Sequence, residues 1–158
     1  MLLGPDGKLY AGVESGRILR MQPDGSAQEV FSDTKGRPLS MAFDSRGSLI
    51  VTDARKGLLS IASDGKVTVL AASVAGAAIG FPDAVVVANS GKIYFTDAST
   101  RFSPAQLGST LEAATLDVME QSATGRVLEY DPTTKAVRVL ARGLSLPTAL
   151  RSARTSTA

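Results

Sequence analysis

The sequence contains no cysteine, no histidine and no tryptophan among its 158 residues. Without cysteine, disulfides, thiol nucleophiles and zinc–thiolate sites are excluded. Without histidine, Ser-His-Asp and Cys-His catalysis and histidine-based metal sites are excluded as well. A metal, if the protein uses one, must therefore be held by oxygen ligands, which points to a hard cation such as calcium or magnesium.

The sequence also lacks an excess of either charge and any long apolar run. Lys and Arg number 17 and Asp and Glu number 15, and this even balance does not indicate a nucleic-acid or membrane-surface partner. No apolar run approaches the ~20 residues of a membrane span. The opening Met-Leu-Leu-Gly-Pro-Asp-Gly has no basic region of the kind that begins a signal peptide. We therefore expect a cytoplasmic protein with no membrane segment.

One pattern recurs three times: a Gly-containing turn, a short apolar strand, a glycine and a second strand. The turn glycines Gly7, Gly47 and Gly91 lie 40 and 44 residues apart. The glycines before the second strand, Gly16 and Gly57, lie 41 residues apart, whereas Gly57 and Gly125 lie 68 apart, 27 more than the previous interval. A period near 40 residues with several short strands is typical of propeller blades. The longer third interval indicates an insertion.

The repeats predict an all-β fold of about three four-stranded antiparallel blades, at residues 5–35, 37–72 and 82–142. Residues rich in Val, Ile, Leu, Thr and Tyr form the expected strands, and Asp-Gly or Pro-Thr-Thr turns join them. In the second and third blades the expected strands cover residues 39–43, 48–53, 57–62 and 66–71, and then 83–88, 92–97, 125–130 and 136–141.

The insertion in the third blade predicts one helix near 104–121. Ser103 is a suitable N-cap, and Pro104 fits the first helical position. Steps of four, three and four residues place one apolar stripe on this helix: Leu107, Leu111, Ala114 and Val118. Three acidic residues lie off the stripe: Glu112, Asp117 and Glu120. We interpret these acids as a solvated helix face, with a position over a pocket as the alternative.

The third copy also resembles a known family. Residues 92–99 (Lys-Ile-Tyr-Phe-Thr-Asp-Ala-Ser) with Phe102, and residues 125–134 (Gly-Arg-Val-Leu-Glu-Tyr-Asp-Pro-Thr-Thr), are similar to the strictosidine synthase-like and gluconolactonase (senescence-marker-protein-like) family, and residues 37–61 look like its preceding blade. The resemblance implies a six-bladed β-propeller with a pocket at one end of its channel. It further implies a calcium or similar divalent ion in the lactonase members.

Against this family the chain looks like an incomplete copy. Six blades of about 40 residues need on the order of 240 residues, and we count three blades. Gly4-Pro5 runs straight into the Asp6-Gly7 turn, so the family's first inner strand, with its metal-binding Glu, is expected to be absent or to lie before the first residue of the given sequence. Residues 146–158 are interpreted as a disordered, out-of-frame tail, with a genuine divergent tail as the alternative. Open blade edges predict self-association.

Asp83 is the candidate metal ligand. It follows Phe81-Pro82 at the start of an inner strand, where the family places an Asp or Asn at the channel mouth, and its carboxylate suits a metal or a substrate hydroxyl. The alternative is that Asp83 only caps the loop. Asp53 and Asp97 recur at equivalent strand ends, as Tyr10 and Tyr94 recur within strands, and such repetition predicts structural roles.

Other charged residues are assigned to the surface or to turns. Arg37 and Arg126 flank turns and are expected to be surface charges. The following residues are expected to be turn residues: Asp6, Asp24, Asp44, Asp64 and Asp131.

The resemblance implies a hydrolase that acts on lactone or ester substrates with a divalent metal, present here as a truncated and inactive fragment that binds no metal tightly. Two alternatives stay open. One is a non-catalytic propeller that serves as a binding scaffold, since fold does not determine function. The other is a strictosidine synthase-type condensing enzyme, whose chemistry depends on a Glu from a late blade that this chain does not contain. A small-molecule substrate is the partner that the resemblance implies for the intact family.

Overall fold

Three four-stranded antiparallel sheets follow one another along the chain in this computed structural model, which describes residues 1–151. In every sheet the strands neighbour one another in chain order. The strands of the first sheet are β1 (Leu2–Leu3), β2 (Leu9–Gly12), β3 (Arg17–Met21) and β4 (Glu29–Asp33). Those of the second are β5 (Pro38–Phe43), β6 (Leu49–Asp53), β7 (Gly57–Ile61) and β8 (Val67–Ala71). Those of the third are β11 (Pro82–Val87), β12 (Ile93–Asp97), β13 (Gly125–Asp131) and β14 (Ala136–Leu144).

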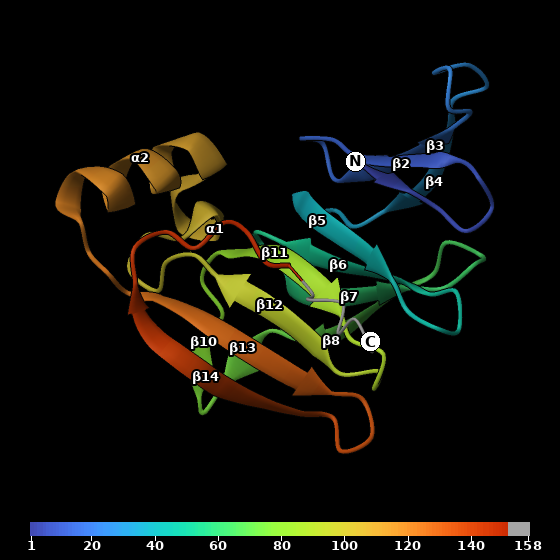
Figure 1. Ribbon diagram of the computed structural model, residues 1–158. Helices are drawn as coiled ribbons and strands as arrows, with labels where there is room; N and C mark the ends of the chain where they lie inside the picture. Colours follow the sequence, from blue (N-terminus) through green and yellow to red (C-terminus); the bar gives the residue numbers. More distant parts are fainter. Residues whose placement is uncertain (152–158) are drawn as a thin grey trace, which may run out of the picture.

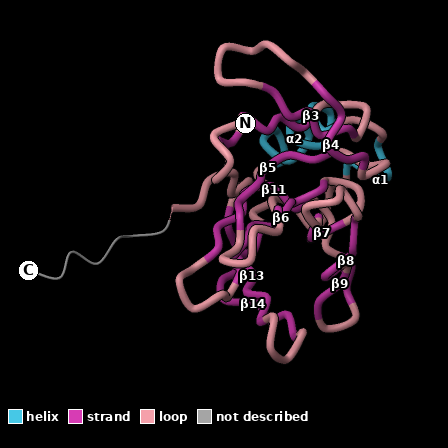
Figure 2. Tube along the Cα trace, turned by 90° about the vertical axis from the view of Figure 1, so that its right-hand side faces the viewer, coloured by secondary structure: helices cyan, strands magenta, loops and turns pink. Residues whose placement is uncertain are grey.

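The sheets pack face to face around two apolar cores, and their first strands β5 and β11 lie side by side (Figures 1 and 2). Tyr10 and Ile18 of the first sheet pack with Leu59 of the second, and Leu58 packs with Phe95 of the third. Neighbouring residues of the middle sheet therefore face opposite cores, which explains why all five residues of β6 are buried, the polar Thr52 and Asp53 at its end included. The predicted all-β partial propeller is confirmed.

Local turn chemistry starts each hairpin. The side chain of Asp44 accepts hydrogen bonds from the backbone N–H groups of Arg46 and Ser48 at 2.9 and 2.8 Å. The same type of contact, to the N–H two residues on, is made by Asp6, Asp24, Asp64 and Asp131. The predicted role of these five aspartates as turn residues is confirmed.

The first sheet contains part of the strand that was expected to be missing. Leu2 and Leu3 pair with Tyr10 and Leu9 and form β1, so the sheet has four strands. Two residues suffice here because β2 offers a free edge to which the opening segment adds backbone hydrogen bonds. The expectation that the whole inner strand is absent was wrong.

The predicted single helix at 104–121 is two helices, α1 (Pro104–Leu107) and α2 (Thr110–Glu120). Gly108 ends α1 in the left-handed conformation, with φ of 80°, and Ser109 caps α2 by accepting a hydrogen bond from the Glu112 N–H. This break changes the direction of the chain between Leu107 and Leu111. One continuous stripe across the whole segment is therefore not formed.

The apolar stripe predicted for the insertion was also wrong. Leu111 and Val118 are 76% and 59% exposed, whereas the buried face of α2 is formed by Ala113 and Asp117. Ala113 packs in one cluster with Phe81, which precedes β11, and with the small residues Ala54 and Ala98, which follow β6 and β12. A small side chain suits this close contact, so packing overrides the apolar periodicity.

The strand register corrects the alignment of the repeats. We expected Gly57 to be equivalent to Gly125, but Asp53 pairs with Gly57 and Asp97 pairs with Arg126. Gly57 therefore corresponds to Arg126, one residue further along. A β-bulge between Gly125 and Arg126 in the pairing with β14 accompanies this shift.

A short hairpin, β9 (Ser73–Val74) with β10 (Ala77–Ala78), joins the second sheet to the third. Beyond β14, residues 145–151 form no helix or strand. Residues 152–158 of the predicted tail lie outside the described residues. Within residues 1–151, the helices are too short to span a lipid bilayer.

Candidate functional site at the start of β11

Asp83 lies at the start of β11, where the backbone is held by side chains of neighbouring strands. The Asp97 carboxylate accepts a hydrogen bond from the Phe81 N–H at 2.7 Å, and Thr96 Oγ1 accepts one from the Ala84 N–H at 2.9 Å. From the second sheet, Thr52 Oγ1 donates to the Asp83 carbonyl oxygen. These contacts fix the backbone on both sides of Asp83, so its side chain starts from a defined position.

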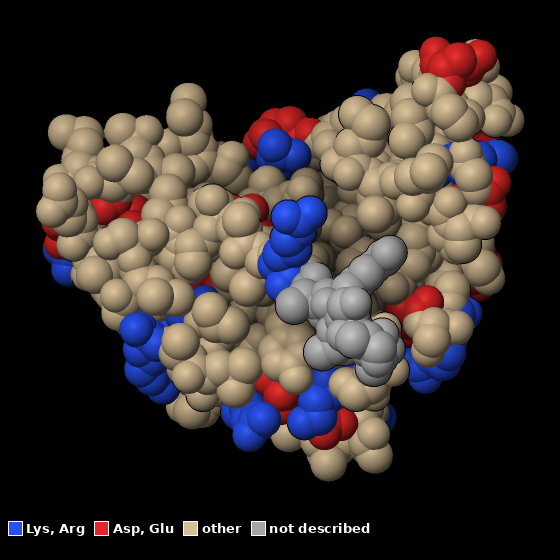
Figure 3. Space-filling model, viewed as in Figure 1, with Lys and Arg blue, Asp and Glu red and all other residues tan. Residues whose placement is uncertain are grey.

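The Asp83 carboxylate is half-buried and makes no ion pair or hydrogen bond with any side chain of residues 1–151. Burial raises its pKa from 3.8 to about 6, because removal from water disfavours the charged form. A positioned carboxylate with a raised pKa is characteristic of a group that binds a ligand or transfers a proton. In the view of Figure 3 the surface is hollowed between the helical part and the first sheet.

A metal requires more ligands than this position supplies. Calcium takes about six to eight oxygen ligands. No group of three or more acidic side chains in residues 1–151 is arranged to hold a metal ion. Asp83 can provide one oxygen ligand, so the described residues do not by themselves fit a metal site.

Asp53 and Asp97 take the structural roles that their repetition predicted. Asp53 is fully buried and accepts hydrogen bonds from Thr34 Oγ1 at 2.7 Å and from the backbone N–H groups of Arg37 and Arg55 at 2.9 and 3.0 Å. In the third sheet Asp97 accepts a hydrogen bond from the Phe81 N–H in the same way. Each aspartate ties the end of its strand to the start of the strand beside it.

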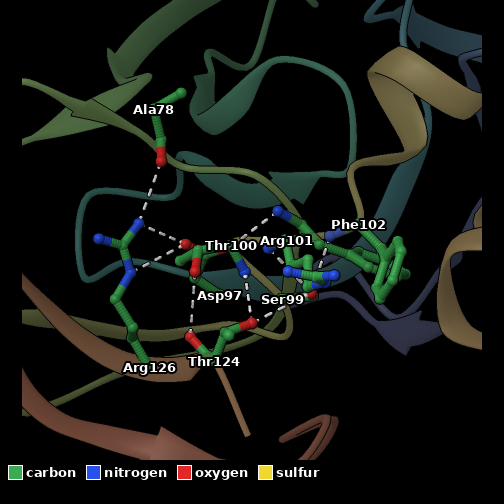
Figure 4. A network of polar contacts seen from close by, with 9 residues as sticks. Ala78, Asp97, Ser99, Thr100, Arg101, Phe102, Thr124 and Arg126 are labelled. Atoms are coloured by element: carbon green, nitrogen blue, oxygen red, sulfur yellow. Dashed lines mark hydrogen bonds and ion pairs between the residues drawn. The ribbon is translucent and has the colours of Figure 1, made fainter. Parts of the chain in front are cut away.

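Arg126 is buried, which corrects the expectation that it is a surface charge. Its side chain is 5% exposed, its Nε donates to Asp97 Oδ2 at 3.1 Å and its Nη2 donates to the same oxygen at 2.5 Å (Figure 4). Nη2 also donates to the Ala78 carbonyl oxygen at 3.1 Å. Sequence reasoning missed this contact because it depends on the pairing of two strands 29 residues apart. The signal is present in the paired motifs that end in Asp97 and begin at Gly125.

Two other charged positions also differ from the prediction. Arg37 is half-buried, and its Nε lies 2.6 Å from Glu14 Oε2. Asp117 was assigned to a solvated face but is 1% exposed, and it accepts a hydrogen bond from Ser122 Oγ at 2.5 Å. Glu120 is at the surface as expected and pairs with Arg101.

The comparisons with known proteins agree with the resemblance and with the propeller fold described above. The model of the strictosidine synthase family matches residues 83–154, and that of the strictosidine synthase-like N-terminal region matches residues 1–21. Protein STRICTOSIDINE SYNTHASE-LIKE 6 of Arabidopsis thaliana is 41% identical over 143 residues, which cover 87% of this chain. The chain belongs to the strictosidine synthase-like family.

Relatives at lower identity also match the chain, and solved structures share its fold. The adipocyte plasma membrane-associated protein of Danio rerio is 32% identical over 160 residues, covering 90% of this chain and 36% of that protein. A gluconolactonase from Xanthomonas campestris has a TM-score of 0.65 at 21% identity, covering 86% of this chain and 44% of its own. A streptogramin B lyase has a TM-score of 0.58 at 14% identity, with coverage of 93% and 40%.

This strictosidine synthase-like chain is short beside its relatives. It spans 37% of the length of the Arabidopsis relative and 36% of that of the Danio relative. Its three sheets correspond to under half of the gluconolactonase chain that it matches.

Proposed function

We propose that the chain forms part of a propeller enzyme that hydrolyses small lactones or esters, with the substrate bound beside Asp83. Family membership and the fold shared with a gluconolactonase support this substrate class. The observation that carries the proposal is the Asp83 carboxylate, which is positioned, half-buried, unpaired within residues 1–151 and raised in pKa to about 6.

The raised pKa gives Asp83 a role as a general base. At pH 7 a carboxyl group with a pKa of about 6 is mostly ionised, yet it accepts a proton more readily than an ordinary aspartate. In the proposed step Asp83 takes a proton from water while the water oxygen bonds to the carbonyl carbon. The bond from that carbon to the ring or ester oxygen then breaks, and the departing oxygen takes up the proton.

We also infer that the 158-residue chain alone is inactive. A divalent metal, which the resemblance implies for lactonase relatives, needs oxygen ligands beyond Asp83, and residues 1–151 supply no cluster of them. Residues 1–151 offer one positioned acid–base group rather than a complete site.

The test joins residues 1–145 to the part of the Arabidopsis relative that follows its matched segment, and assays the fusion on a panel of lactones and aryl esters. We expect the fusion to hydrolyse these substrates and the 158-residue chain alone not to do so. The Asp83→Asn variant of the fusion should lose kcat by about a hundredfold. Asp64→Asn, at an exposed turn, is the matched control. Equal activity of the Asp83→Asn fusion contradicts the role of Asp83, and binding without turnover favours a scaffold.

A further inference from the structure

A groove of about 740 Å³ lies between the second and third sheets. Arg55 and Lys56 line it from the turn between β6 and β7. The hairpin of β9 and β10 forms another wall, and Arg126 and Arg142 line it from the paired strands β13 and β14. All of these segments belong to the two sheets and their connection, so the groove is formed within this chain. Asp83 does not line it.

The charge in this groove has one sign. Four cationic side chains line it, Arg55, Lys56, Arg126 and Arg142, and no acidic residue of the described chain does. Arg126 is neutralised by Asp97 beneath it, and Arg55 lies 3.8 Å from a carboxylate oxygen of Glu14.

Lys56 and Arg142 remain uncompensated. Both are exposed, and neither forms an ion pair with any residue from 1 to 151. They approach the groove from different sheets. Two positive charges therefore face one recess without counter-charges.

The walls of the groove are fixed before any ligand binds. The Arg126 guanidinium joins Asp97 of β12 to the Ala78 carbonyl of β10, so it holds the hairpin against the third sheet (Figure 4). Its Nη1 makes no hydrogen bond to the described residues. Arg55 donates from Nη2 to the Gly108 carbonyl oxygen at 2.9 Å. These contacts reduce the ordering that a ligand would otherwise have to impose.

Neutral hydrogen-bonding groups complete the lining. Ser103 Oγ accepts from the Ala105 N–H, which leaves its O–H group to donate, and the Gln106 side chain makes no hydrogen bond to residues 1–151. Thr100 and Thr124 also line the groove. Ala77, Ala78 and Ile79 give one wall an apolar surface. Cations, hydroxyl groups and an apolar wall together suit a molecule with a charged head and a carbon skeleton.

We propose that this groove binds a small molecule through a phosphate monoester group. Such a group carries a charge of about −1.5 to −2 at pH 7 and three strong acceptor oxygens. This charge matches Lys56 and Arg142, and the oxygens match the donors of Arg126, Ser103 and Gln106. The volume lies within the range of about 300–1,000 Å³ that is usual for small-molecule pockets, so it leaves space for the organic part.

The test measures binding of inorganic phosphate and glucose 6-phosphate to the 158-residue chain by titration calorimetry, and of phosphatidate vesicles against phosphatidylcholine vesicles by co-sedimentation. Binding of the soluble ester indicates a soluble ligand, and binding of the phosphatidate vesicles alone indicates a lipid headgroup. Either result supports the proposal if it is lost in the Lys56→Gln/Arg142→Gln variant.

The control variant Lys66→Gln/Arg17→Gln removes the same charge at exposed positions outside the groove. We expect about a tenfold or greater loss of affinity in the groove variant, no change in the control, and weaker binding as salt rises. Equal affinity of the two variants overturns the proposal. So does the absence of binding tighter than about 1 mM for every probe.

Discussion

Asp97 and Arg126 form a buried ion pair that joins the ends of β12 and β13, with Arg126 Nη2 2.5 Å from Asp97 Oδ2. In the second sheet Asp53 takes the position of Asp97, but its partner across the strands is Gly57. The Oδ2 oxygen of Asp53 instead accepts a hydrogen bond from the Thr34 hydroxyl group. The same strand-end aspartate is therefore satisfied by an arginine in one sheet and by a hydroxyl group in the other.

The first prediction concerns this ion pair. Arg126→Leu should lower the free energy of unfolding by about 3–5 kcal/mol, because the Asp97 carboxylate is then left buried without its partner. Arg17→Leu changes an exposed arginine at the equivalent strand position of the first sheet, and should cost within about 0.5 kcal/mol. Urea denaturation measures both values. Similar losses in the two variants would show that the buried pair contributes little.

The repeat architecture could be predicted from sequence because its signals are local. An aspartate that hydrogen-bonds the N–H two residues on, as Asp44 does, forms its turn without help from distant residues. The spacing of these turns fixes the number of sheets. The first three residues of β6, Leu49, Ile50 and Val51, are likewise visible as a short apolar run in the sequence.

The missed features depend on contacts between distant segments. The burial of Arg126 follows from pairing across the helical insertion, and the exposure of Leu111 follows from the break at Gly108 and from what Ala113 packs against. The groove around Lys56 and Arg142 joins residues more than 80 positions apart in sequence. No local pattern specifies which of these side chains meet.

The second prediction concerns pH. The Asp83 pKa is raised from 3.8 to about 6, so between these values the folded state keeps a proton that the unfolded state releases. Stability therefore falls as pH rises from about 4 to about 6. Asp83→Asn should remove this fall and stabilise the protein at pH 7 by up to about 3 kcal/mol, with little effect at pH 3.5.

Urea denaturation at a series of pH values measures the effect. Asp24→Asn is the control of opposite sign, because hydrogen bonds from Ser26 lower the Asp24 pKa and stabilise the ionised folded form. Removal of the Asp24 carboxylate should lower the free energy of unfolding at neutral pH. An Asp83→Asn profile that runs parallel to the parent profile would count against a proton held at Asp83.

The third prediction concerns calcium. Asp83 is a single carboxylate, and residues 1–151 hold no cluster of three acidic side chains that could complete a site. We expect the 158-residue chain to bind calcium no more tightly than about 1 mM, since tighter sites need more oxygen ligands. Titration calorimetry measures this affinity, and Asp83→Asn should give the same trace. A micromolar site in the parent chain would refute the prediction.

The fourth prediction concerns self-association. The outer strands of the three sheets each expose a large apolar residue, Val30 at 53%, Val69 at 54% and Leu140 at 45%. Such residues on free strand edges favour pairing with another chain. We expect the chain to form a two-fold pair of twice 16.4 kDa or larger aggregates, rather than a monomer.

The face of the third sheet that points away from the second sheet favours the two-fold pair over larger aggregates. Phe95 and Leu128 point to the core shared with the second sheet, so Tyr94 and Glu129 point the other way. Glu129 is 4% exposed, and Arg138 and Lys92 donate to it at 2.7 and 3.1 Å. This face is therefore apolar only in part, and a partner must match its charges.

Light scattering and sedimentation equilibrium measure the mass, and two variants separate the modes of association. Val30→Lys/Val69→Lys places charges on two free edges and should suppress aggregates that grow strand to strand. It should leave intact a pair that joins sheet faces, because those faces lie away from the edges. A parent chain that stays a monomer and melts cooperatively would contradict the prediction, since its open faces would then be stable in water without a partner.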